Sequence, residues 1–132
     1  MVMSIEQEIV KAIAAHAKWK LRLRHAIESG SAGTDMLDIG REDKCAFGQW
    51  MLGPTVSAET RESMDFLLVR QFHAKFHDAA SRVVKLVSDG KMSDADALLN
   101  GEYTLLSMEL TAQLVNWKQR IETRLANDTP PQ

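Results

Sequence analysis

Residues 66–87, which read FLLVRQFHAKFHDAASRVVKLV, decide the fold of this chain. Their core-type residues recur at alternating spacings of three and four, which places them on one stripe of an α-helix. The stripe consists of Phe66, Val69, His73, Phe76, Ala80, Val83 and Val87. This spacing is typical of a helix that packs at a shallow angle in a bundle. It predicts a long helix that starts after an N-cap at Ser57 and stops at Gly90.

The segments on either side predict two more long helices. Apolar residues recur at helical spacing from Ser4 to Ser29, and again from Ser93 until Pro130 and Pro131 prevent continuation. The pair Asn100–Gly101 is a candidate kink in the last helix. No segment shows sustained period-two alternation, so we expect no β-sheet.

The connection between the first two long helices holds most of the glycines. Five of the seven lie between Gly30 and Gly53. Within it, residues 46–52 predict a short helix, because Phe47, Trp50 and Met51 have the spacing that covers a bundle face. The expected fold is all-α: an antiparallel four- or five-helix bundle with a short capping helix in its first long connection.

Length and charge predict one domain over residues 1–132, with a core at about 5–125 and a frayed tail of five residues. The net charge is −2, and no run of four like charges occurs. Such a pattern argues against nucleic acid as a partner. The apolar stretches are too short for direct membrane insertion, and the start of the chain lacks a signal-peptide core, so a cytoplasmic location is expected.

Ligand-type residues interrupt the apolar stripes at three places. His73 and His77 are four apart, so one metal ion can bridge them on a helix face. His16 continues the core stripe of the first helix, and Cys45 follows the glycine-rich connection. Together they form a complete N₃S set for Zn²⁺. A histidine on an apolar stripe can also be an ordinary core residue, and a lone cysteine is often a small buried hydrophobe. His25 points the opposite way from His16 and is expected to be exposed.

Aromatic residues flank these candidates and have two interpretations. They are core fillers, or they also exclude water from the ion and orient its ligands. The residues concerned are Trp19, Phe47, Trp50, Phe72 and Phe76. Trp117 and Tyr103 are assigned to the core of the last helix. From the sequence, the ion is the only strong link that we identify between the capping helix and the two long helices.

Three sequence blocks resemble the chemoreceptor zinc-binding (CZB) domain family. They are His-Ala-Lys-Trp at 16–19, Cys-Ala-Phe-Gly-Gln-Trp at 45–50 and His-Ala-Lys-Phe-His at 73–77. Between His16 and Cys45 lie 28 residues, and between Cys45 and His73 lie 27. The resemblance implies a helical bundle, often a homodimer, with one zinc held by His16, Cys45, His73 and His77. It also implies a regulatory module beside a chemoreceptor signalling domain or a diguanylate cyclase domain, in cis or in trans.

The resemblance further implies sensing of zinc level or of oxidants such as hypochlorous acid, with Cys45 as the redox-reactive residue. Exposed apolar residues near the last helix's main stripe also favour a homodimer: Leu98, Leu105, Met108, Ala112 and Val115. The alternatives are a structural zinc scaffold or interaction module and, less favoured, a metalloenzyme or hemerythrin-like carrier. A catalytic zinc needs an open position, and a di-iron carrier needs more histidines and bridging carboxylates. We therefore expect no catalytic residues.

Overall fold

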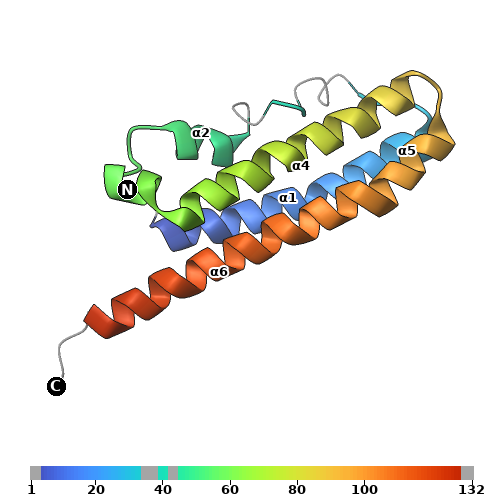
Figure 1. The fold of residues 1–132 in the computed structure, drawn as a ribbon. Helices are drawn as coiled ribbons and strands as arrows, with labels where there is room; N and C mark the ends of the chain where they lie inside the picture. The colour runs from blue at the N-terminus through green and yellow to red at the C-terminus, as the bar shows by residue number, and fades with distance from the viewer. Residues whose placement is uncertain (1–3, 34–38, 42–44, 129–132) are drawn as a thin grey trace.

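The computed structural model describes residues 4–33, 39–41 and 45–128. Three long helices lie side by side: α1 (Ile5–Ser29), α4 (Met64–Ser88) and α6 (Thr104–Asp128) (Figure 1). The short helices α2 (Ala46–Leu52) and α3 (Ala58–Glu62) precede α4, and α5 (Met92–Leu98) with the π-helical turn η3 (Leu99–Tyr103) leads into α6. The described residues include no β-strand, so the expected all-α bundle is confirmed. The expected frayed tail falls largely on residues 129–132, outside the described part.

The long helices do not all alternate in direction. Asp65 at the start of α4 lies 3.6 Å from Arg120 in the second half of α6, and Ile5 of α1 shares a pocket with Trp117. At the other end of the bundle, Arg24 donates to Asn100. Thus α6 is antiparallel to α1 and α4, whereas those two are parallel to each other, and α3, which precedes α4, lies beside Ile5 at the start of α1 (Figure 1).

Serine caps set where the helices begin. The Ser4 hydroxyl accepts from the Gln7 N–H at 3.2 Å, the Gln7 side chain accepts from the Ser4 N–H, and α1 therefore begins as predicted. The prediction that Ser57 caps the long helix was wrong. Ser57 caps α3, and a second serine, Ser63, caps α4 by accepting from the Phe66 N–H. The extended backbone of Ser63 breaks what the pattern presents as one helix.

The core lies among the three long helices. Every member of the α4 stripe quoted above is at most 2% exposed, which confirms the prediction. Tyr103, Leu110, Leu114 and Trp117 are buried opposite it. No helix in the described ranges is both long and apolar enough to span a bilayer.

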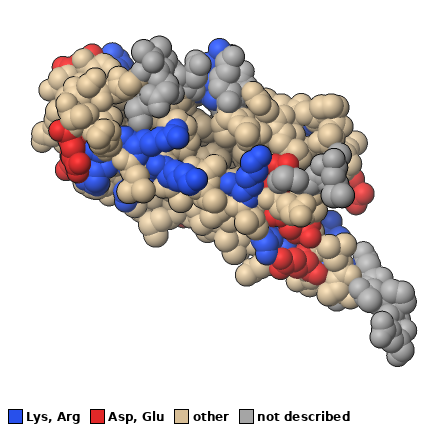
Figure 2. Space-filling model, turned by 180° about the vertical axis from the view of Figure 1, so that it is seen from behind, with Lys and Arg blue, Asp and Glu red and all other residues tan. Residues whose placement is uncertain are grey.

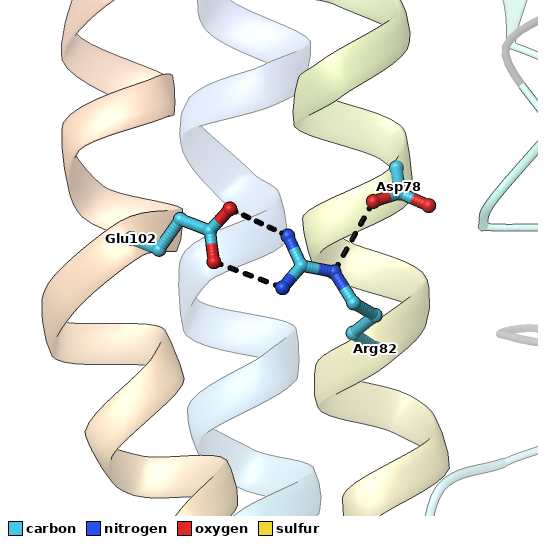
Figure 3. A network of polar contacts seen from close by, with 3 residues as sticks. All are labelled: Asp78, Arg82 and Glu102. Atoms are coloured by element: carbon cyan, nitrogen blue, oxygen red, sulfur yellow. Dashed lines mark hydrogen bonds and ion pairs between the residues drawn. The ribbon is translucent and has the colours of Figure 1, made fainter.

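The last helical segment contains a π-turn where a kink was expected. The turn includes Asn100 and Gly101, and the Thr104 hydroxyl donates to the carbonyl of Leu99 at 2.7 Å. Arg82 of α4 reaches across to Glu102 with two bonds of 2.8 and 2.7 Å and contacts Asp78 on its own helix (Figure 3). This network fastens the turn to α4 and raises the pKa of Arg82, chiefly through its hydrogen bond to Glu102.

Candidate metal centre

Three separate segments bring four candidate ligands together in the middle of the bundle. His16 comes from α1, Cys45 is the N-cap of α2, and His73 and His77 come from α4. One ligand atom from each residue lies within 4.8 Å of every other. The three histidines are at most 5% exposed, and Cys45 is half-buried.

Four of the six distances among these atoms match those of a tetrahedral zinc site, and all six are within 4.8 Å. His73 Nε2 lies 3.2 Å from His16 Nε2 and 3.1 Å from His77 Nε2. Cys45 Sγ lies 3.8 Å from His16 Nε2 and 3.5 Å from His73 Nε2. Zinc bonds of about 2.0 Å to nitrogen and about 2.3 Å to sulfur, at tetrahedral angles, require roughly 3.3 Å between nitrogens and roughly 3.6 Å from nitrogen to sulfur. The residues therefore fit the ion.

Backbone carbonyls orient two of the imidazoles. His16 Nδ1 lies 2.7 Å from the carbonyl of Ala12, one turn earlier on α1. His77 Nδ1 lies 2.6 Å from the carbonyl of Ile39 in the long connection. A carbonyl can only accept, so both Nδ1 atoms carry the proton and both Nε2 atoms keep a lone pair. These lone pairs are on the nitrogens that face the other ligands, the arrangement that metal-binding histidines need.

Burial keeps the three imidazoles neutral. Desolvation lowers the pKa of His16 to about 4, partly opposed by its bond to Ala12. Desolvation also lowers the pKa of His73 to about 2, with smaller effects of His77 and His16. The pKa of His77 is lowered by burial too, against the effect of the Ile39 carbonyl. Neutral imidazoles are ready to bind a metal ion near pH 7 without first losing a proton.

Two phenylalanines form walls around the cluster. The Phe47 ring meets His16 and His73 edge-on, with centroids 6.2 and 5.3 Å away. The Phe76 ring meets His16 and His77 in the same manner at 5.1 and 5.5 Å. Both side chains are at most 4% exposed, so they exclude water from the imidazoles.

The other three flanking aromatics lie farther out. Trp50 stacks on Phe47 at 5.6 Å and touches Trp117 of α6 at 6.2 Å. Trp19 and Phe72 are half-buried at the edge of the core, where Arg22 and Lys75 respectively lie over their rings. Trp19 and Phe72 thus pack at the edge of the core, where a cation covers each ring.

Packing also anchors the capping helix, which corrects the expectation that only the ion links it to the bundle. Phe47 and Met51 of α2 are buried at 4% and 1% exposure. Arg61 of α3 donates to the carbonyls of Met51 and Gly53 at the end of α2. The sequence pattern showed the apolar spacing of α2 but not its partners. Trp117 is far away in the chain, and Arg61 lies beyond a turn.

Two site features have no clear sequence signal. The carbonyl of Ile39 is a backbone group, so no residue type in the sequence indicates that it contacts the site. A small pocket of about 50 Å³, lined in part by Glu8, Lys11 and Ala15, reaches Cys45 and His16 between α1 and α2. It depends on the packing of two helices from separate segments. His25, in contrast, is exposed as predicted.

A helical bundle whose core gathers three neutral imidazoles and a thiol at this spacing has the architecture of a metal-binding domain. The family model described as the chemoreceptor zinc-binding domain matches residues 16–84, and the chain belongs to this family. All four clustered residues lie within the matched range. Comparisons with curated proteins and with solved structures give no significant match. Family membership makes this a zinc-binding domain of chemoreceptor-type signalling, a regulatory class.

Proposed function

We propose that this chain is a cytoplasmic sensory domain of bacterial signal transduction that holds one Zn²⁺ through His16, Cys45, His73 and His77. The observation that carries the proposal is the close approach of the three Nε2 atoms and the sulfur, with four of their six distances at the values that a tetrahedral zinc site needs. The ion would stabilise Cys45 as a thiolate. Four protein ligands fill a tetrahedral shell and leave no position for a substrate, which favours regulation over catalysis.

The surroundings of Cys45 suit a reaction with small oxidants. Its thiol is half-buried, and the pocket beside it has room for about one small molecule. In the proposed step the sulfur of the thiolate attacks an oxygen of hydrogen peroxide, the O–O bond breaks, and hydroxide leaves. With hypochlorous acid the O–Cl bond breaks and chloride leaves. In both cases the product is a sulfenic acid, a weaker ligand than the thiolate.

The signal we propose is a loosening of the α2 cap. Oxidation weakens the bond that joins the N-cap of α2 to α1 and α4, whereas the contacts of Phe47 and Trp50 remain. The cap therefore shifts rather than unfolds. A partner domain, either a chemoreceptor signalling domain or a diguanylate cyclase domain, would read this shift in cis or in trans.

Self-association would carry the shift between chains. Leu105 and Met108 on the outer face of α6 are 64% and 63% exposed, and Val115 continues the same face at 37%. Their spacing of three and seven residues forms a straight apolar row on a helix. We include a C₂ homodimer through this face in the proposal.

The test is to treat zinc-loaded protein with stoichiometric peroxide or hypochlorous acid. Zinc release and hydrogen exchange over residues 46–53 are followed together, with Cys45→Ser as the control. Release coupled to faster exchange in α2 supports redox sensing. If Cys45 is oxidised at the rate of an ordinary free thiol, with zinc retained and exchange unchanged, redox sensing is contradicted. Reversible zinc exchange at low free zinc would then favour zinc-level sensing, and permanently bound zinc would favour a structural ion.

A further inference from the structure

Besides Cys45 and α2, the described part of the connection between α1 and α4 also meets the candidate metal centre at Ile39–Gly40. The side chain of Ile39 is only 4% exposed, and its carbonyl accepts a hydrogen bond from His77 Nδ1 at 2.6 Å. The carbonyl that accepts a hydrogen bond from His16 belongs to the same helix, so it is in place whenever that helix forms. His77 depends on a segment 38 positions away in the chain. Something other than helix geometry must hold this segment in place.

Gly40 allows the connection to approach α4 this closely. A Cβ atom at position 40 would lie 2.8 Å from Ser81 Cβ and 2.9 Å from Ser81 Oγ. The hydroxyl could rotate away, but the Cβ of Ser81 is attached to the α4 backbone and cannot. Gly40 is not among the glycines with positive φ, which are Gly30 and Gly90. The position therefore requires glycine for space, not for an unusual backbone conformation.

Ser81 lies one helical turn beyond His77 on α4. The close contact of Gly40 with Ser81 and the hydrogen bond of Ile39 with His77 are thus neighbouring contacts on one face of α4. Any residue larger than glycine at position 40 pushes the connection outward, and the short hydrogen bond next to it, between Ile39 and His77, is the first contact to lengthen.

We propose that Gly40 is a positioning residue for the metal site: its contact with Ser81 holds the Ile39 carbonyl against His77, which fixes the tautomer and the aim of that imidazole. The inference rests on the proposed zinc site and adds a residue outside the four ligands. Loss of an outer contact of this kind lowers metal affinity by about 10- to 100-fold.

The experiment compares wild type with Gly40→Ala, Ser81→Gly and the double variant. Zinc affinity is measured by competition with a chelator, and the protonation of the His77 ring nitrogens is measured by ¹⁵N NMR in metal-free protein. Gly40→Ala is expected to bind zinc about 10- to 100-fold more weakly and to lose the single Nδ1–H tautomer of His77. Ser81→Gly removes the Cβ that a new Cβ at position 40 would meet, so the double variant should regain both properties of the Ser81→Gly single variant. Gly101→Ala is the matched control, because a Cβ there meets nothing within 4 Å.

Wild-type affinity together with a wild-type tautomer in Gly40→Ala would overturn the proposal. A weakened Gly40→Ala that Ser81→Gly does not restore would overturn it as well, since the contact would then not be the cause. If Gly40→Ala fails to fold, the double variant decides by the same two measurements against Ser81→Gly. If the wild-type protein binds no zinc, the proposed function fails, and the tautomer comparison still tests the role of Gly40.

Discussion

In the metal-free protein, protonation of any histidine of the cluster costs free energy. Desolvation of the buried rings of His16, His73 and His77 disfavours the first positive charge. A second positive charge would also be repelled by the first, because the rings lie close together. The unfolded chain has no such restriction and takes up protons near pH 6.5. Folding is therefore coupled to pH through these residues.

We predict that metal-free protein loses stability as the pH falls. The pKa of His16 drops from 6.5 in the unfolded chain to about 4 in the fold, so its contribution is complete above pH 6.5 and is lost as the pH falls toward 4. Between about pH 7 and pH 5, His16 alone should reduce the free energy of unfolding by about 2 kcal/mol. Urea unfolding of chelator-treated protein measures this.

The exposed His25 provides the control. His25→Gln should leave the pH dependence as in wild type, whereas His16→Gln should reduce it by the share of His16 and leave that of His73 and His77. An unchanged slope in His16→Gln would contradict the assignment of the pH dependence to the buried cluster.

Tyr103 offers a second residue-level prediction. It is fully buried, its hydroxyl has no hydrogen-bond partner among the described residues, and burial raises its pKa. Its ring packs on Phe76 at 5.2 Å, a contact that phenylalanine would preserve. Tyr103→Phe should therefore raise the free energy of unfolding by about 1 kcal/mol, measured by urea unfolding. Destabilisation instead would show that the hydroxyl has a favourable partner, such as a buried water molecule.

The three candidate histidines could be predicted from the sequence because helical spacing fixes which side chains share a face, whereas Cys45 lies outside a helix and was a candidate by its place after the glycine-rich connection. His16 and the pair His73 and His77 lie on apolar stripes, and the structure places all three in the core. The Ile39 carbonyl and the Gly40–Ser81 contact could not be predicted. They depend on how a glycine-rich connection folds back, which spacing along a helix does not encode.

At the scale of elements, α2 is the part of the fold whose attachment differs most from expectation. Its predicted bounds are confirmed, because Phe47, Trp50 and Met51 define a clear apolar face. Its attachment by Trp50 to Trp117 and by Arg61 to its last carbonyls adds to the contact at Cys45. The break at Ser63 was likewise hidden, because residues 57–65 hold no Gly or Pro that would mark it and only the cap geometry reveals it.

We predict that Trp50→Ala loosens α2 even when zinc is bound. The variant loses the stacking on Phe47 and the contact with Trp117 while all four candidate ligands remain. Amide hydrogen exchange within residues 46–52 should become about 10-fold faster, which corresponds to about 1.4 kcal/mol of local opening energy. Mass spectrometry of exchanged peptides measures it.

Leu52→Ala is the matched control on the same helix, because Leu52 is 44% exposed. It should leave exchange in α2 close to that of wild type. Unchanged exchange in Trp50→Ala would contradict the claim that Trp50 helps to anchor the cap.

At the scale of the whole molecule, α1 carries an excess of positive charge. The stretch from residue 9 to residue 27 holds five Lys and Arg residues and no Asp or Glu. Viewed from behind, Lys and Arg gather across the middle of the molecule (Figure 2). Two copies that paired through a basic α1 would repel each other, whereas the row of Leu105, Met108 and Val115 on α6 has no such obstacle.

We therefore predict a homodimer that depends on the outer face of α6. Light scattering at tens of micromolar should give twice the chain mass for wild type and one chain mass for Met108→Glu, because a buried unpaired carboxylate is costly. Leu67→Glu, at an exposed residue of α4, is the control and should remain a dimer. A monomeric wild type would favour a different partner on this face.

The sequence predicted the bundle as a whole, but the antiparallel arrangement expected from it holds for α6 against α1 and α4 and not between α1 and α4. Periodicity shows that α1, α4 and α6 exist and which faces they bury. It does not show that the chain returns along the bundle after α1, so that α2 and α3 lead into an α4 parallel to α1. That path is what brings Ile39 and Cys45 to the histidines.

The measurement that tests the central claim most directly is the zinc content of the purified protein and its variants. The account predicts close to one Zn²⁺ per chain for wild type and for His25→Ala. It predicts strongly reduced zinc with largely retained helicity for His73→Ala and Cys45→Ala, because the buried core is large enough to fold without the ion. Equal zinc content in wild type, His73→Ala and Cys45→Ala would contradict the assignment of the site.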